Sequence, residues 1–166
     1  MRLSAALIAG VALLPGSAIA GTGSTKTVTG SAAAQAITPL TLVHWARREL
    51  DFGRFATNGS GSVTVNAVTG AGSVAGGVSY VSGSTPNMDY FIASGDPGRL
   101  LGIVTGSGTI SAGAATMSFT TTPMLAAGFL PLTGSGYFTV GGILTVNAGQ
   151  APGQYTGSYS VTVTYQ

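Results

Sequence analysis

The sequence contains no cysteine, a single histidine and only four acidic residues. Structural zinc and iron–sulfur sites need thiolates or several imidazoles, so this composition excludes both kinds of site. The six Lys and Arg residues are too few to form the positive stripe that nucleic-acid binding requires. Most active sites gather several titratable side chains, and only 6% of this chain is charged. We therefore expect a non-enzymatic protein with no cofactor and no bound metal.

Long apolar runs are also scarce, apart from one near the N-terminus. Met1-Arg2 precedes an apolar stretch from Leu3 to Leu14, and Ala18-Ile19-Ala20 has the small residues that signal peptidase recognises. The stretch is shorter than the ~20 residues that cross a bilayer as a helix. It therefore indicates a cleaved signal peptide rather than a membrane anchor.

This assignment divides the chain into three parts. Residues 1–20 are the predicted signal peptide, residues 21–31 a flexible Gly/Thr/Ser arm, and residues 32–166 a single domain. We expect the product to be exported to the periplasm, the cell surface or the medium, with no stable membrane insertion. Because the domain has no disulfide, its stability must come from a hydrophobic core or from partner chains.

The sequence is rich in Thr, Ser, Val and Gly, which favour β-strands and tight turns. Near the C-terminus, apolar and hydroxyl side chains alternate strictly, which is typical of a half-buried strand. The apolar face of this strand carries Tyr159, Val161, Val163 and Tyr165. Similar patterns predict strands at Ala36–Val43, Glu49–Phe55, Ser62–Val68, Gly77–Val81, Asp89–Ala93, Leu100–Thr105, Ala115–Thr120 and Tyr137–Val146.

Turn residues separate these segments. The clearest signals are Asn58-Gly59, Thr69-Gly70, Asp96-Pro97-Gly98, Gly106-Ser107-Gly108, Gly134-Ser135-Gly136 and Pro152-Gly153. Short strands at such spacing predict an all-β protein, an antiparallel β-sandwich of about 7–10 strands. A closed β-barrel is the alternative, since periodicity does not distinguish the two.

Motifs at both ends of the predicted domain resemble a known family. Near its start lies Leu50-Asp51-Phe52-Gly53, and its end has the pattern Gly-x-Tyr-x-Gly-x-Tyr-x-Val-x-Val-x-Tyr. The residues of that second pattern are Gly153, Tyr155, Gly157, Tyr159, Val161, Val163 and Tyr165. Together with the segment from Phe138 to Val146, they resemble the bacterial exported domain-of-unknown-function family 4402. More distantly, they are similar to spore coat U-type pilin domains and chaperone–usher fimbrial subunits.

The resemblance implies an immunoglobulin-like, pilin-like sandwich in which an N-terminal strand of one subunit completes the next subunit. Its implied partners are copies of the chain or related subunits, and a periplasmic chaperone and usher. The extended, uncharged segment Ala32–Leu42 is the candidate assembly strand. Its apolar positions are Ala34, Ala36, Ile37, Leu40 and Leu42. The alternative is that Ala32–Leu42 is the first strand of its own domain.

A few residues allow chemical interpretations, each beside a structural one. His44-Trp45 suits a ligand site or a strand end with Trp45 on the sheet edge. In a strand, Glu49 and Asp51 would lie about 7 Å apart, the separation of an inverting glycosidase, although arginines nearby make solvated ion pairs the simpler interpretation. We prefer to place Asp51 as the cap of a turn at Phe52-Gly53, with Phe52 buried.

Two further interpretations concern binding. Asp89 and Asp96 are candidate calcium ligands on neighbouring loops, but their spacing matches no known calcium loop. Tyr155, Tyr159 and Tyr165 form either a sugar-stacking stripe or part of the core and sheet edge. We expect an exported structural protein, a pilus-like or cell-surface subunit that assembles by β-strand addition. The alternative is a monomeric carbohydrate-binding or adhesive module.

Overall fold

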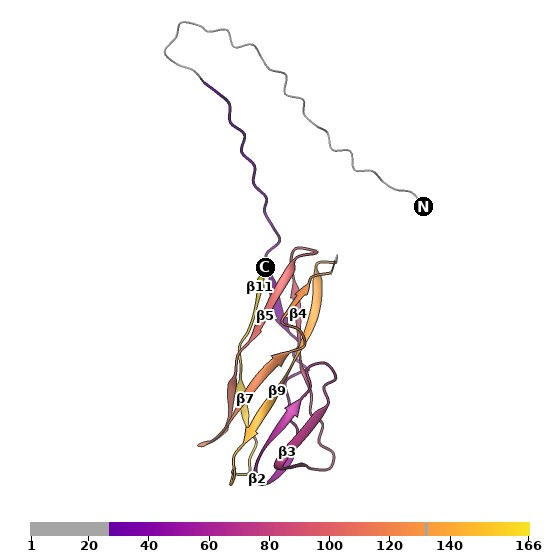
Figure 1. The fold of residues 1–166 in the computed structure, drawn as a ribbon, viewed down its shortest axis with the longest axis vertical. Helices are drawn as coiled ribbons and strands as arrows, with labels where there is room; N and C mark the ends of the chain where they lie inside the picture. Colours follow the sequence, from indigo (N-terminus) through magenta and orange to yellow (C-terminus); the bar gives the residue numbers. More distant parts are fainter. Residues whose placement is uncertain (1–26, 132) are drawn as a thin grey trace, which may run out of the picture. The chain divides into compact units, whose positions relative to one another are not determined.

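The computed structural model describes residues 27–131 and 133–166, so the predicted signal peptide and most of the predicted arm lie outside the described residues. All regular structure in the described part is β-strand, with no helix, which confirms the all-β prediction. The strands, shown in Figure 1, are β1 (Thr41–His44), β2 (Phe55–Val65), β3 (Gly72–Tyr80), β4 (Asp89–Ser94), β5 (Leu100–Thr105), β6 (Gly108–Ala112), β7 (Ala115–Pro123), β8 (Ala127–Phe129), β9 (Ser135–Val146), β10 (Thr156–Ser158) and β11 (Val161–Tyr165). They all belong to the compact unit formed by residues 36–166.

The strands form two antiparallel sheets, so the fold is a β-sandwich rather than a closed barrel. The larger sheet has the order β1-β4-β9-β7-β6-β10, and β2 and β3 extend it from β9. The smaller sheet has the order β11-β5-β8. The ribbon made by β5 and β11 continues into β6 and β10, so it passes from the smaller sheet to the larger one.

The long strand β9 organises the larger sheet. One edge of β9 pairs with β4 along residues 135–140 and with β2 along residues 142–146, while β7 pairs with the opposite edge. Gly141 lies where β4 gives way to β2, and a Cβ at this position would collide with the carbonyl oxygen of Val65. Only glycine allows the two backbones to approach so closely.

Inward-facing side chains of the two sheets form two core clusters. The first contains Phe52, Val63, Val65, Val78, Met117, Phe119, Leu144 and Val146. The second contains Phe91, Ala93, Leu101, Ile103, Leu130, Phe138 and Val140. Tyr159 packs against both clusters and so connects them. Since burial of one large apolar side chain contributes ~1.5–3 kcal/mol, these clusters are the main source of stability.

Several sequence predictions need correction. Asn58-Gly59 is not a hairpin turn, because β2 runs through it and absorbs the extra residues in a register shift between Thr57 and Gly61. The predicted strand Glu49–Phe55 is wrong: before Phe55 it contains only an isolated bridge, which joins Asp51 to Asn87.

Short strands account for the other differences. The predicted set lacks β6 and β8, and it treats β10 and β11 as one strand. The predicted turn at Gly106-Ser107-Gly108 is instead the place where the chain passes from β5 to β6. The predicted turns at Thr69-Gly70 and Asp96-Pro97-Gly98 are confirmed, with positive φ at Gly70 and Gly98.

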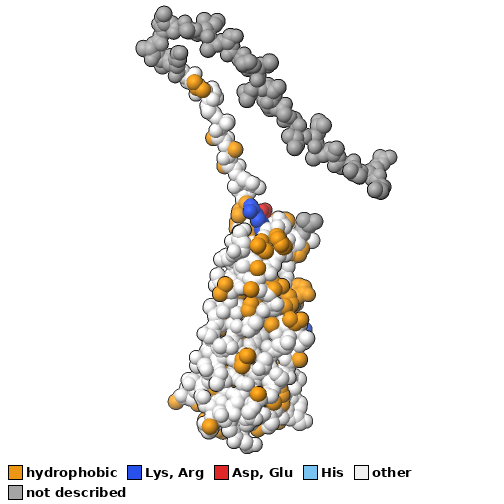
Figure 2. Space-filling model, viewed as in Figure 1, with side chains coloured by type: hydrophobic (Ala, Val, Ile, Leu, Met, Phe, Trp, Pro, Cys, Tyr) orange, Lys and Arg blue, Asp and Glu red, His pale blue; other side chains and the backbone are white. Residues whose placement is uncertain are grey.

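The surface is nearly free of charge. On the face drawn in Figure 2, white predominates, the colour given to uncharged polar side chains and the backbone. This agrees with the 6% of charged residues in the sequence. Recognition at this surface therefore depends on backbone edges and apolar side chains more than on ion pairs.

Candidate functional site

The Leu50-Asp51-Phe52-Gly53 motif forms a tight turn beneath the first core cluster. The Asp51 carboxylate accepts a hydrogen bond from the Gly53 N–H at 2.7 Å, and Phe52 is buried against Phe119. Leu50 packs on the rim of the same cluster. Gly53 has a φ of 77°, and a Cβ there would collide with the hydroxyl of Ser84. Asp51 therefore caps the turn, as we expected from the sequence, and its carboxylate is used by the hydrogen bond from Gly53.

The C-terminal motif has the predicted alternation. Tyr159, Val161, Val163 and Tyr165 are partly buried, and the residues between them are exposed. Gly157 lies in β10, where a Cβ would collide with the carbonyl oxygen of Thr109, and Gly153 lies against Ala112.

The three tyrosine hydroxyls of the C-terminal motif all have partners within the protein. Tyr155 donates to the carbonyl of Ala151 at 2.6 Å, and Tyr165 donates to the carbonyl of Thr38 at 2.8 Å. Tyr159 donates to the carboxylate of Asp89 at 2.6 Å. Their rings pack against the core clusters and are partly buried, which favours the core and sheet-edge interpretation over a sugar-stacking stripe.

The candidate assembly strand divides into two parts. Leu42 lies in β1 and pairs with Ala93, and Leu40 packs against the second core cluster. Ala34, Ala36 and Ile37 are exposed and belong to no strand. The end of the predicted segment is thus part of the first strand of its own domain, and the residues before Leu40 are free of strand pairing.

β11 has one unpaired edge. Ser160 accepts a backbone hydrogen bond from Gly106, and Gln166 donates one to Leu100, so every second residue between them faces β5. The intervening N–H and C=O groups point to the opposite edge, where no strand lies in the described part of the chain. They belong to the residues whose side chains face the core, Val161, Val163 and Tyr165.

β1 has a free edge of the same kind. It pairs only with β4, and Trp45 donates to the carbonyl of Tyr90, which places Leu42 and His44 on the unpaired side. Side chains span the space between the free edges of β1 and β11: Tyr165 donates to the carbonyl of Thr38, three residues before β1, and Tyr159 and His44 meet at Asp89. Figure 1 shows β11 and β4 at the same end of the sandwich, and β1 pairs with β4. We call these two edges the seam.

Three polar side chains close the other end of the seam. Asp89 is 4% exposed, and its carboxylate accepts hydrogen bonds from the Tyr159 hydroxyl at 2.6 Å and from the Tyr90 N–H at 2.7 Å. The Nε2 atom of His44 lies 2.7 Å from the same carboxylate. This group, which we call the Asp89 cluster, joins β1, β4 and the connection between β10 and β11. Sequence reasoning misses it, because positions 44, 89 and 159 meet only through the sheet topology.

The hydrogen bonds of the Asp89 cluster hold strands together. Desolvation, and the hydrogen bond to Asp89, raise the pKa of Tyr159, so its hydroxyl remains a donor. Within the described residues, no serine or threonine hydroxyl is hydrogen-bonded to His44. Since a buried carboxylate needs compensating donors, the cluster fixes the position of His44 on β1.

The other acidic residues are not arranged for the chemistry considered above. Asp96 forms an ion pair with Arg99 at 3.0 Å, whereas Asp89 belongs to the Asp89 cluster. Glu49 and Asp51 do not lie in a strand, and none of the arginines near them forms an ion pair within the described residues, so the predicted ion pairs are wrong. In the same part of the chain, no three His, Asp or Glu residues are grouped as metal ligands.

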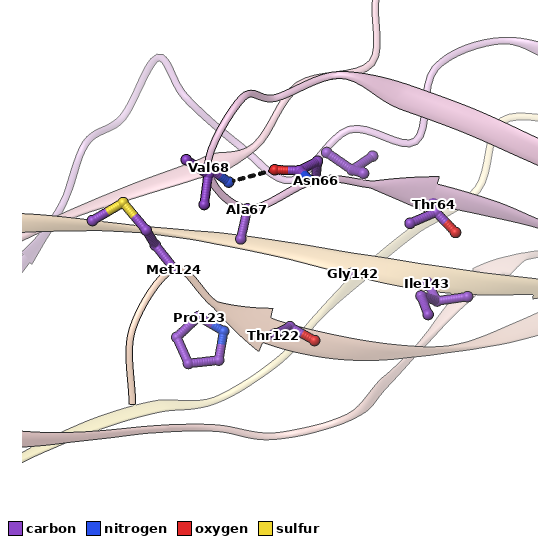
Figure 3. Close-up of a pocket in the computed structure, with 10 residues that line it drawn as sticks. Thr64, Asn66, Ala67, Val68, Thr122, Pro123, Met124, Gly142 and Ile143 are labelled. Carbon is purple, nitrogen blue, oxygen red and sulfur yellow. Dashed lines mark hydrogen bonds between the residues drawn. The ribbon is translucent and has the colours of Figure 1, made fainter. Parts of the chain in front are cut away.

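A hollow of about 310 Å³ lies between the ends of β2 and β7 and the second half of β9. Figure 3 shows Met124, Pro123 and Ala67 around it, with Asn66 turned toward the backbone of Val68. The carboxamide oxygen of Asn66 accepts a hydrogen bond from the Val68 N–H at 2.8 Å, so it is already used within the loop. No residue that lines the hollow is charged, so it offers no acid–base chemistry.

The family comparison agrees with the position of these motifs. The family described as "Domain of unknown function (DUF4402)" matches residues 42–165, a range that includes every strand except the first residue of β1. The chain belongs to this family. No curated protein and no solved structure gives a significant match. Over the described residues, no helix has the length and hydropathy to cross a membrane.

Proposed function

We propose that this DUF4402 protein is an exported, non-enzymatic structural subunit that assembles at the cell surface by β-strand addition. The observation that carries the proposal is the seam. The edges of β1 and β11 both have free backbone groups and no strand pairs with them in the described part of the chain, although Val161, Val163 and Tyr165 of β11 face the core. Unpaired edges of this kind are templates for an additional strand.

The second core cluster supports the same conclusion. Leu40, Val161, Val163 and Tyr165 pack against it, yet each remains only partly buried. An added strand along β11 would bond to the free groups of Val161 and Val163 and would cover their side chains. Two paired strands lie about 4.8 Å apart and are joined by backbone bonds, whereas here a tyrosine side chain bridges the space.

The segment from residue 27 to residue 36 has the pattern of a donor strand. Small apolar or glycine residues occupy alternate positions, and hydroxyl or amide residues occupy most of the others. The first set is Val28, Gly30, Ala32, Ala34 and Ala36. The segment is exposed, uncharged and outside any strand, and Val28 is 90% exposed. In the proposed assembly this segment of one copy pairs with β11 of the next, and a periplasmic chaperone covers the seam before assembly.

Deletion of residues 27–35 tests this proposal. The full chain is expected to form ladders that resist SDS, whereas the deleted chain stays monomeric with an unchanged melting temperature, because the strands lie in residues 36–166. A matched control replaces residues 27–35 by a Gly/Ser linker of equal length, which keeps the reach of the segment but removes its apolar face. The proposal would be contradicted if the full chain, the deleted chain and the linker variant formed SDS-resistant ladders in equal amounts.

A further inference from the structure

An aromatic cluster lies on the outer face of the larger sheet, on the side away from the second core cluster. It consists of Trp45, Tyr90 and Tyr137, contributed by the end of β1, by β4 and by β9. The rings of Tyr90 and Tyr137 are stacked, with centroids 5.0 Å apart and an interplanar angle of 13°. Trp45 meets Tyr90 edge-on at 5.5 Å. We call these three residues the aromatic surface.

The aromatic surface is open to solvent. Trp45 is 49% exposed and Tyr137 is 62% exposed, although side chains of this size are normally buried. In the described part of the chain, the hydroxyls of Tyr90 and Tyr137 have no hydrogen-bond partner, unlike those of the C-terminal tyrosines. The surface therefore combines exposed ring area with free hydroxyl groups, which a ligand can use.

Positive charge borders the aromatic surface. Arg47 and Arg48 lie two and three residues after Trp45, and neither forms an ion pair within the described residues. Arg48 donates a long hydrogen bond, at 3.4 Å, to Asn87, which lies three residues before Tyr90 in the chain. Desolvation and the neighbouring Tyr137 raise the pKa of Tyr90, and the positive charge of Arg48 opposes this increase.

We propose that the aromatic surface binds a polysaccharide whose pyranose rings carry carboxylate groups. The apolar C–H face of a pyranose packs against an aromatic ring, and its hydroxyls bond to those of Tyr90 and Tyr137. Guanidinium groups bind carboxylates through paired hydrogen bonds, which gives Arg48 a partner. This binding site is separate from the seam, so it does not depend on strand addition.

Trp45 allows a direct test, because it is the single tryptophan of the chain. The full chain is titrated with hexagalacturonate, an acidic oligosaccharide, while the tryptophan emission is recorded. A saturable change is expected, and Tyr137→Ala should weaken the apparent affinity by about tenfold or more. Arg48→Gln should weaken hexagalacturonate binding by about fivefold and leave the weaker binding of neutral cellohexaose unchanged. Phe129→Ala is the matched control, since Phe129 is 73% exposed but lies on β8 of the other sheet.

Three results would overturn this proposal. The first is the absence of a saturable change at millimolar hexagalacturonate. The second is an equal loss of binding in the Phe129→Ala control. The third is an emission change that depends on protein concentration alone, since Val43 is exposed on the same face and would then help to join two copies. A thermal melt of Tyr137→Ala, expected to match the parent chain, separates loss of binding from loss of fold.

Discussion

The two core clusters differ in how completely the strands enclose them. Around the first, the side chains of Val63, Leu144 and Val146 are at most 1% exposed, and β2, β7 and β9 pair on both edges. Around the second, the inward side chains of β11 are only partly buried, and β11 pairs on one edge. We call the part of the sandwich around the first cluster the closed half and the part around the second cluster the open half. The closed half has the buried core that a stable monomer needs. The open half has the free strand edge that strand addition needs.

The largest expected effect is in the closed half. Leu144→Ala would leave a cavity in the first cluster, and we expect a loss of about 2–5 kcal/mol in the free energy of unfolding. Urea denaturation measures it. Ile143→Ala is the matched control, because Ile143 is the neighbouring residue on β9 and is 44% exposed. Its loss should be below ~1 kcal/mol. Equal losses in the two variants would contradict the assigned orientation of β9.

A smaller effect is expected where the two halves meet. Tyr159→Phe removes one of the donors to the buried Asp89 carboxylate, which should lower the free energy of unfolding by about 1.5–3 kcal/mol. Tyr155→Phe serves as a control, since its hydroxyl donates to an exposed carbonyl, and it should lose about 1 kcal/mol or less. A Tyr159→Phe protein as stable as the parent would show that the Asp89 cluster does not hold the seam.

The smallest effect on the monomer is expected in the open half. Val163→Ala removes a half-buried side chain, so the isolated chain should lose only about 1 kcal/mol in the free energy of unfolding. Assembly should suffer more, because the added strand would cover this position. The comparison is made by melting the monomer and by timing its conversion to SDS-resistant ladders. A variant that assembles at the parent rate would remove Val163 from the proposed interface.

Sequence alone predicts the parts of this fold that depend on local alternation. Strict period-two patterns locate β11 and most of β9, and the turn role of Asp51 follows from its two neighbours. The register shift in β2 is not predictable in this way, because Asn58-Gly59 is equally suited to a turn, and only pairing with β3 and β9 decides between them. The Asp89 cluster and the aromatic surface depend on contacts between distant strands, so no local pattern reveals them.

Residue-resolved amide hydrogen exchange tests the central claim, that the outer edge of β11 is free in the monomer and paired in the assembly. In the monomer, the amides of Val161, Val163 and Tyr165 should exchange rapidly, while those of Thr162 and Thr164, which face β5, are protected. In the assembled protein, all five should be protected. Protection of Val163 in the monomer, or rapid exchange of Val163 in the assembly, would contradict the account.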